Sequence, residues 1–207
     1  MPELDKQYWN NRYLQNNTGW DIGYPSTPLK KYIDQLTDKS QSILIPGCGN
    51  SYEAEYLLQN GFTNIIVIDI APFLTAELEK KLNDYLNKQL TIITGDFFEF
   101  HNQYDLIIEQ TFFCALGPSL RKKYVQQVSQ LLKPGGKLVG VLFNREFEGG
   151  PPFGGSIGEY TGLFSEKFSI EIMESCYNSI SPRAGSELFI KLKRKSQIGR
   201  ASCRERV

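Results

Sequence analysis

Short apolar runs alternate with amphipathic segments from about residue 42 to residue 143. Runs rich in β-branched residues predict strands, and apolar residues that recur every three or four positions predict helices. We expect strands at residues 42–46, 64–69, 90–94, 104–108 and 137–143. Between them the pattern predicts helices at residues 51–60, 72–87 and 118–132. This alternating order predicts a parallel sheet with helices on both faces.

The ends of the elements are marked by capping and turn residues. Asn50 is the expected N-cap of the helix at 51–60, with Glu53 three residues on, and Gly61 stops that helix. The run Lys133-Pro134-Gly135-Gly136 is expected to end the helix at 118–132.

The pattern changes on either side of this alternating region. Two helices are expected before it, near residues 4–14 and 27–36. After it, a Gly/Pro loop at 148–155 leads to a helix at 158–166 and two strands, 168–177 and 186–195, that form an antiparallel pair. We expect one domain, 1–196, whose residues 1–40 form a helical cap. Residues 197–207 lack a periodic apolar face and are predicted to be a disordered or extraneous tail.

Composition excludes several classes of protein. Lys plus Arg and Asp plus Glu are 23 each, so the formal net charge is zero and a nucleic-acid partner is not expected. No signal-like segment opens the chain and no apolar run could span a bilayer, which predicts a cytoplasmic protein. None of the four cysteines forms a C-x-x-C pair and His101 is the sole histidine, so no metal site is expected. We expect a monomer.

A glycine turn after the first strand predicts a nucleotide-like cofactor. Gly47 and Gly49 let the backbone approach a ligand, and Asp69, which ends the next strand, could accept hydrogen bonds from both hydroxyls of a ribose. These features fit a dinucleotide or S-adenosylmethionine. The dinucleotide fingerprint requires a third glycine where this chain has Tyr52, which disfavours a nicotinamide oxidoreductase.

The segment after the third strand favours adenosine binding. Asp96 could accept from an adenine amino group, and Phe97 could flank the ring. The neighbouring Phe98 is expected in the core.

Several motifs, in conserved order from Trp9 to Lys195, resemble the thiopurine S-methyltransferase family, and most closely its plant-type halide/thiol methyltransferase branch. Those motifs are Trp9-x-x-x-Tyr13, Gly19-Trp20-Asp21-x-Gly23, Leu44-Ile45-Pro46-Gly47-Cys48-Gly49, Asp96-Phe97-Phe98, Phe112-Phe113-Cys114-Ala115, Leu131-Leu132-Lys133-Pro134-Gly135-Gly136 and Gly149-Gly150-Pro151-Pro152-Phe153.

The resemblance implies a Rossmann-like class I methyltransferase fold, with a seven-stranded, mostly parallel α/β sheet whose last strand is antiparallel. It implies S-adenosylmethionine as cofactor, with the N-terminal segment folded over it. The family usually has arginine or tyrosine at the cofactor contact after the fourth strand, where this chain has Gln110. The expected cofactor-binding residues are Trp9, Tyr13, Trp20, Pro46, Gly47, Gly49, Asp69, Asp96, Phe97 and Gln110.

The expected chemistry is in-line methyl transfer to a small acceptor, which requires alignment and exclusion of water more than a base. His101 lies in a loop, and no catalytic residue can be named. A thiol, hydrosulfide, thiocyanate, halide or related chalcogen compound would fit. The alternatives are a cofactor-binding protein without transferase activity and a methyltransferase for another small acceptor. Candidate substrate residues are Phe112, Phe113, Arg145, Phe153 and Arg183.

Overall fold

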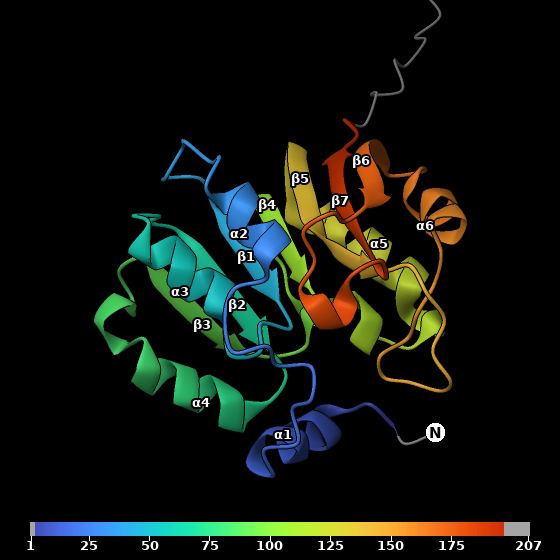
Figure 1. The fold of residues 1–207 in the computed structure, drawn as a ribbon. Coiled ribbons are helices and arrows are strands. Elements are labelled where there is room, and N and C mark those ends of the chain that lie inside the picture. Colours follow the sequence, from blue (N-terminus) through green and yellow to red (C-terminus); the bar gives the residue numbers. More distant parts are fainter. Residues whose placement is uncertain (1–2, 197–207) are drawn as a thin grey trace, which may run out of the picture.

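The computed structural model describes residues 3–196 and has one seven-stranded sheet with helices on both faces (Figure 1). The strands are β1 (Ile43–Pro46), β2 (Ile65–Asp69), β3 (Leu90–Thr94), β4 (Tyr104–Gln110), β5 (Leu132–Phe143), β6 (Phe168–Ser175) and β7 (Glu187–Arg194). The α-helices are α1 (Lys6–Leu14), α2 (Thr27–Ile33), α3 (Tyr52–Gln59), α4 (Pro72–Lys81), α5 (Arg121–Leu131) and α6 (Ile157–Phe164). Within residues 3–196, no helix is both long and apolar enough to cross a membrane.

The strand order, β3-β2-β1-β4-β5-β7-β6, confirms the predicted fold class. The first five strands in this order pair in parallel, whereas β7 is antiparallel to both β5 and β6. Because β1 lies between β2 and β4, the turns that follow these strands meet at one edge of the sheet. Helix α1 lies apart from the sheet, below it in Figure 1.

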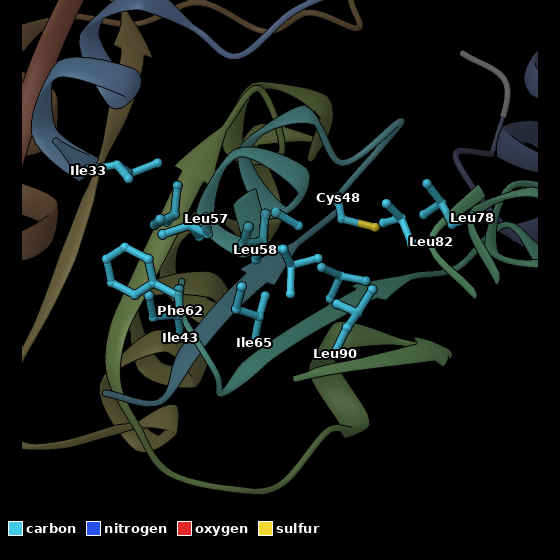
Figure 2. Packing of buried hydrophobic residues seen from close by; sticks show 14 of the residues in the cluster. Ile33, Ile43, Cys48, Leu57, Leu58, Phe62, Ile65, Leu78, Leu82 and Leu90 are labelled. Atoms are coloured by element: carbon cyan, nitrogen blue, oxygen red, sulfur yellow. The ribbon is translucent and has the colours of Figure 1, made fainter. Parts of the chain in front are cut away.

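Two apolar layers hold the helices against the sheet. On one face α2, α3 and α4 pack on alternate residues of β1, β2 and β4, and Figure 2 shows Leu57 and Leu58 of α3 beside Ile43 and Ile65. On the other face α5 and α6 pack on the remaining residues, including Leu44 and Ile107. Strand β1 is buried along its whole length because both faces are covered.

Several predicted helix ends were wrong. Ser51, in a left-handed conformation (φ 55°), is the N-cap of α3, and its side chain makes no capping hydrogen bond. Asn50 instead donates to Asp21, and Glu53 accepts from Ser26 N at 2.8 Å. Both side chains therefore bind the N-terminal segment, a long-range contact that a capping pattern does not reveal.

Other boundaries differ by about one turn. Helix α4 ends at Lys81 and is followed by a 3-10 turn, Asn83–Tyr85, while residues 118–120 form the 3-10 turn Pro118–Leu120 before α5 begins. The segment 132–136, expected to end the helix and lead into a strand, already belongs to β5. The antiparallel pairing of the last two strands is confirmed. The predicted tail, 197–207, lies outside the described residues.

We predict that Gly140 is essential for packing. A Cβ there would lie 2.5 Å from both Cβ and the backbone oxygen of Glu109 on β4, so Gly140→Ala should lower the free energy of unfolding by about 1–3 kcal/mol. Gly162 is the matched control, because it lies in α6 with no atom near its would-be Cβ. Gly162→Ala should raise stability by about 0.5–1 kcal/mol. Urea unfolding measures both, and equal effects would contradict this account of β4–β5 packing.

Candidate cofactor and acceptor site

A cavity of about 620 Å³ opens at the carboxyl edge of the sheet. The turns after β1, β2, β3 and β4 line one part of it. The N-terminal segment and the loop after β5 line another part, together with Leu120 and with Arg183 from the turn between β6 and β7. The structure brings these sequence-predicted residues together around the cavity: Trp9, Tyr13, Trp20, Gly47, Asp69, Asp96, Phe97, Phe112 and Arg183.

The turn after β1 requires glycine for a reason that the sequence did not reveal. Gly47 has φ 54°, and a Cβ there would lie 2.2 Å from the ring of Phe112. Phe112 belongs to the segment after β4, so the two turns are in direct contact. A side chain at position 47 would push this aromatic residue away from the cavity.

Asp69 is a buried carboxylate at the end of β2. Its Oδ1 accepts from Ala71 N at 3.0 Å, and its Oδ2 accepts from Gly49 N at 3.4 Å. Burial raises the pKa of Asp69 to about 6, although these backbone donors favour the ionised form. The carboxylate retains lone pairs that could accept from a ligand in the cavity.

The turn after β3 is held by hydrogen bonds from both sides. Asp96 Oδ1 accepts from Phe98 N at 2.8 Å, and Gln127 Nε2 of α5 donates to the carbonyls of Phe97 and Phe100 at 2.8 and 2.7 Å. Phe97 is buried, and its ring lies 5.1 Å from that of Phe112. Phe98, which we expected in the core, is half-buried and lines the cavity as well.

Three aromatic side chains of the N-terminal segment meet over the cavity. Trp20 makes edge-to-face contacts with Trp9 at 5.6 Å and with Tyr13 at 5.7 Å between ring centroids. Burial and the charge of Asp69 raise the pKa of Tyr13, so its hydroxyl stays protonated. These rings could exclude water from a bound cofactor.

Polar contacts attach this segment to the rest of the protein. Asp21 accepts hydrogen bonds from Asn50 and from Tyr52, the latter at 3.2 Å. On the other side, Arg183 Nη2 donates to the Trp20 carbonyl at 2.8 Å. Tyr52 stands where the dinucleotide fingerprint requires a third glycine. In this structure it instead helps to hold the segment that covers the cavity.

A buried glutamate positions the segment after β4. Glu109 Oε1 accepts from the backbone N–H groups of Phe112 and Phe113 at 2.8 and 2.9 Å, and Oε2 accepts from the hydroxyl of Tyr124 at 2.6 Å. Burial raises the pKa of Glu109 to about 7. Both oxygens face protein donors, so this carboxyl group holds the loop and does not face the cavity.

The loop after β5 is held against the same region. Phe153 N donates to the Cys114 carbonyl at 2.6 Å, and the Tyr160 hydroxyl donates to the Phe143 carbonyl at 2.8 Å. Arg121 of α5 donates to the Gly154 carbonyl and pairs with Glu159. These contacts hold the loop after β5 against Cys114, α5 and α6, and so fix the wall of the cavity that this loop forms.

Some sequence-predicted residues lie outside the cavity lining. Pro46 is buried within β1, and Gly49 faces Asp69 through its N–H. The Gln110 amide oxygen is buried without a hydrogen-bond partner, and Thr111 lines the cavity in its place.

Three expected substrate residues also lie outside it. Phe113 packs in the core against Tyr124 and Tyr160, and Phe153 is buried against Gly150. Arg145 is exposed, and its guanidinium lies 4.7 Å from the Phe147 ring centroid.

Other lining residues could not be predicted from the sequence because their neighbours are distant in the chain. They are mostly apolar and gave no chemical signal; Ile70 could have been proposed from its place beside Asp69. They include Arg12, Ile70, Thr111, Leu116 and Phe143. Pro151 and Pro152, which belong to the motif at residues 149–153, line the cavity as well.

Besides Asp5, Asp69 and Asp96, the cavity lining offers few side chains that could accept a proton. Burial raises the pKa of Cys114 to about 12, and its Sγ lies 3.1 Å from the Thr111 carbonyl. His101 is exposed and does not line the cavity. Among residues 3–196, no group of three or more His, Cys, Asp or Glu side chains could hold a metal ion.

Solved structures share this fold. A Burkholderia thailandensis 1,6-didemethyltoxoflavin-N1-methyltransferase with bound S-adenosylhomocysteine superposes with a TM-score of 0.72 over 92% of this chain and 87% of that chain, at 15% identity. A magnesium protoporphyrin IX methyltransferase from Synechocystis PCC 6803 gives a TM-score of 0.72 over 92% and 100%, at 14% identity. At these identities the likeness shows the fold alone.

Sequence comparisons identify the family. A probable thiol methyltransferase 2 of Arabidopsis thaliana is 29% identical, covering 95% of this chain and 88% of the relative. A thiocyanate methyltransferase 1 of Brassica oleracea is 26% identical over 90% and 85%, and a Vibrio cholerae thiopurine S-methyltransferase is 29% identical over 77% and 81%. The family model for thiopurine S-methyltransferase matches residues 4–195. The chain therefore belongs to the thiopurine S-methyltransferase family, and it is a methyltransferase that uses S-adenosylmethionine.

Proposed function

We propose that the protein transfers the methyl group of S-adenosylmethionine to a small, soft nucleophile that arrives already ionised. Hydrosulfide, thiocyanate, iodide and aromatic thiolates are such acceptors. The acceptor's lone pair forms the new bond to the methyl carbon while the sulfonium C–S bond breaks, leaving S-adenosylhomocysteine. The names of the plant relatives, thiol and thiocyanate methyltransferase, support this class of acceptor.

The observation that carries the proposal is an apolar wall whose own side chains carry no titratable group. Among the described residues, the carboxylates that line the cavity come from other segments: Asp5 is the N-cap of α1, Asp69 ends β2 and Asp96 follows β3. The wall is formed by Phe112, Leu116, Phe143, Pro151 and Pro152. An acceptor that is already ionised requires only positioning and desolvation from such a site.

The cofactor's placement follows from the same cavity. In this proposal Asp69 accepts from the ribose hydroxyls, and Asp96 and Phe97 contact the adenine. Gly47 and Phe112 border the methionine part, while Trp9, Tyr13 and Trp20 cover the ligand. Of the two arginines expected from the sequence to contact the acceptor, Arg145 and Arg183, Arg183 is the one that lines the cavity and could attract an anionic acceptor. A monomer in the cytoplasm stays a prediction.

Cofactor affinity should depend on Asp69 and on pH. Two hydrogen bonds to a carboxylate contribute on the order of 1.5–3 kcal/mol each, so Asp69→Asn should weaken S-adenosylhomocysteine binding at least about tenfold. The raised pKa means that the free protein holds a proton on Asp69 below about pH 6, and binding must release it. Wild-type affinity should therefore rise as pH increases through about 6.

Isothermal titration from about pH 5 to about pH 8 measures this dependence. The stability of the free protein should change in the opposite direction, because the folded state binds the Asp69 proton more tightly than the unfolded state. That stabilising contribution is lost as pH rises through about 6. If wild type and Asp69→Asn bound equally well with the same pH profile, the ribose site would have to lie elsewhere.

Acceptor chemistry should be visible in the pH dependence of turnover. Across a series of thiols, the rate of S-adenosylhomocysteine formation should follow the thiolate fraction of each substrate and rise through that substrate's own pKa. Iodide, which does not titrate in this range, is the matched control and should show no such rise. One pH profile shared by every acceptor would instead reveal an enzyme base and contradict the proposal.

A further inference from the structure

Arg12 is a cation on the cavity wall without an anionic partner. It lies in the last turn of α1, and its guanidinium carbon lies 5.1 Å from the Trp20 ring centroid and 6.0 Å from that of Tyr8. The side chain is half-buried, and its Nε makes no hydrogen bond. Within residues 3–196, no carboxylate lies within 4.0 Å of the guanidinium nitrogens.

The other cations that line the cavity are in different surroundings. The Arg183 guanidinium lies 3.5 Å from the buried Glu187 carboxylate and also donates to the Trp20 carbonyl. Lys6 is exposed to solvent, which screens its charge. Asp5, Asp69 and Asp96 add negative charge to the same wall.

An anion enclosed here would need a counter-charge, because removing a carboxylate from water without a partner is costly. S-adenosylmethionine carries such a carboxylate on its methionine part. A guanidinium matches a carboxylate with two parallel hydrogen bonds, and the guanidinium of Arg12 lies over the Trp20 ring on the cavity wall.

The position of Arg12 fits the methionine end of the ligand. The adenosine end is proposed at Asp69 and Asp96. Trp20 lies nearer the end of β5, because its carbonyl accepts a hydrogen bond from Arg183, and the Arg183 guanidinium lies 5.8 Å from the Phe143 ring centroid at the end of that strand. The Arg12 guanidinium lies over the ring of this same Trp20. We propose that Arg12 binds the carboxylate of the cofactor, an inference that rests on the proposed placement of the adenosine.

The test compares two ligands that differ in one group. S-adenosyl-3-thiopropylamine equals S-adenosylhomocysteine without its carboxylate. In isothermal titrations, Arg12→Met should weaken S-adenosylhomocysteine binding about 10- to 100-fold and change binding of the decarboxylated ligand by less than about twofold. Arg12→Lys, which keeps the charge but not the paired donors, should give an intermediate loss. Lys80→Met is the control for net charge, since Lys80 is exposed on α4, pairs with Glu77 and does not line the cavity.

Three results would overturn the inference. Equal losses for both ligands would mean that Arg12 acts only by supporting Trp20. No loss for either ligand would place the carboxylate elsewhere. A raised KM for an anionic acceptor, with S-adenosylhomocysteine affinity unchanged, would assign Arg12 to the acceptor. Asp69→Asn separates the underlying placement from this inference: it should weaken both ligands, and if it weakens neither, the adenosine placement itself fails.

Discussion

Parallel pairing of β1 with β2 and β4 is the constraint on which the site depends. Parallel strands end at the same edge of a sheet, and the order β3-β2-β1-β4 makes their turns neighbours. Gly47, Asp69, Asp96 and Phe112 are far apart in the sequence, yet all line one cavity because each follows or ends one of these strands. The helices on both faces keep the strands in this order by covering their apolar side chains.

The position of the walls depends on polar groups buried behind them. A buried carboxylate is costly unless donors surround it, and Glu109 has three: two backbone N–H groups and the Tyr124 hydroxyl. Together these bonds connect β4, α5 and the turn that carries Phe112. That turn in turn contacts Gly47, so the geometry of the cavity near β1 depends on a residue that does not face it.

The N-terminal segment completes the site through a different kind of contact. Its aromatic rings contact one another. Asp21 accepts a hydrogen bond from Asn50 in the turn before α3, and the Trp20 carbonyl accepts one from Arg183. Polar groups thus attach the segment to the rest of the protein and aromatic rings face the cavity, as expected for a cap that presents an apolar surface to the ligand. In this account Arg12 supplies the charge on that surface that binds the cofactor's carboxylate.

The sequence predicts the parts of this structure that follow from local patterns. Alternating apolar segments predict the sheet, and the glycine turn with Asp69 predicts a cofactor site at the carboxyl edge of the sheet, where the cavity lies. The pattern does not reveal that Asn50 and Glu53 bind the N-terminal segment, since both residues fit a local capping motif equally well. Likewise, Phe113 and Phe153 are aromatic residues beside the site in sequence, but packing against Tyr160 and Gly150 buries them. Such outcomes depend on contacts between distant segments.

A crystal structure with bound S-adenosylhomocysteine tests the central claim most directly. The account predicts the adenosine in the cavity at the carboxyl edge of the sheet, with both ribose hydroxyls within about 2.5–3.0 Å of the Asp69 carboxylate oxygens. The aromatic rings of Trp9, Tyr13 and Trp20 should cover the ligand. A nucleoside bound away from Asp69, or a ribose whose hydroxyls face solvent, would contradict it.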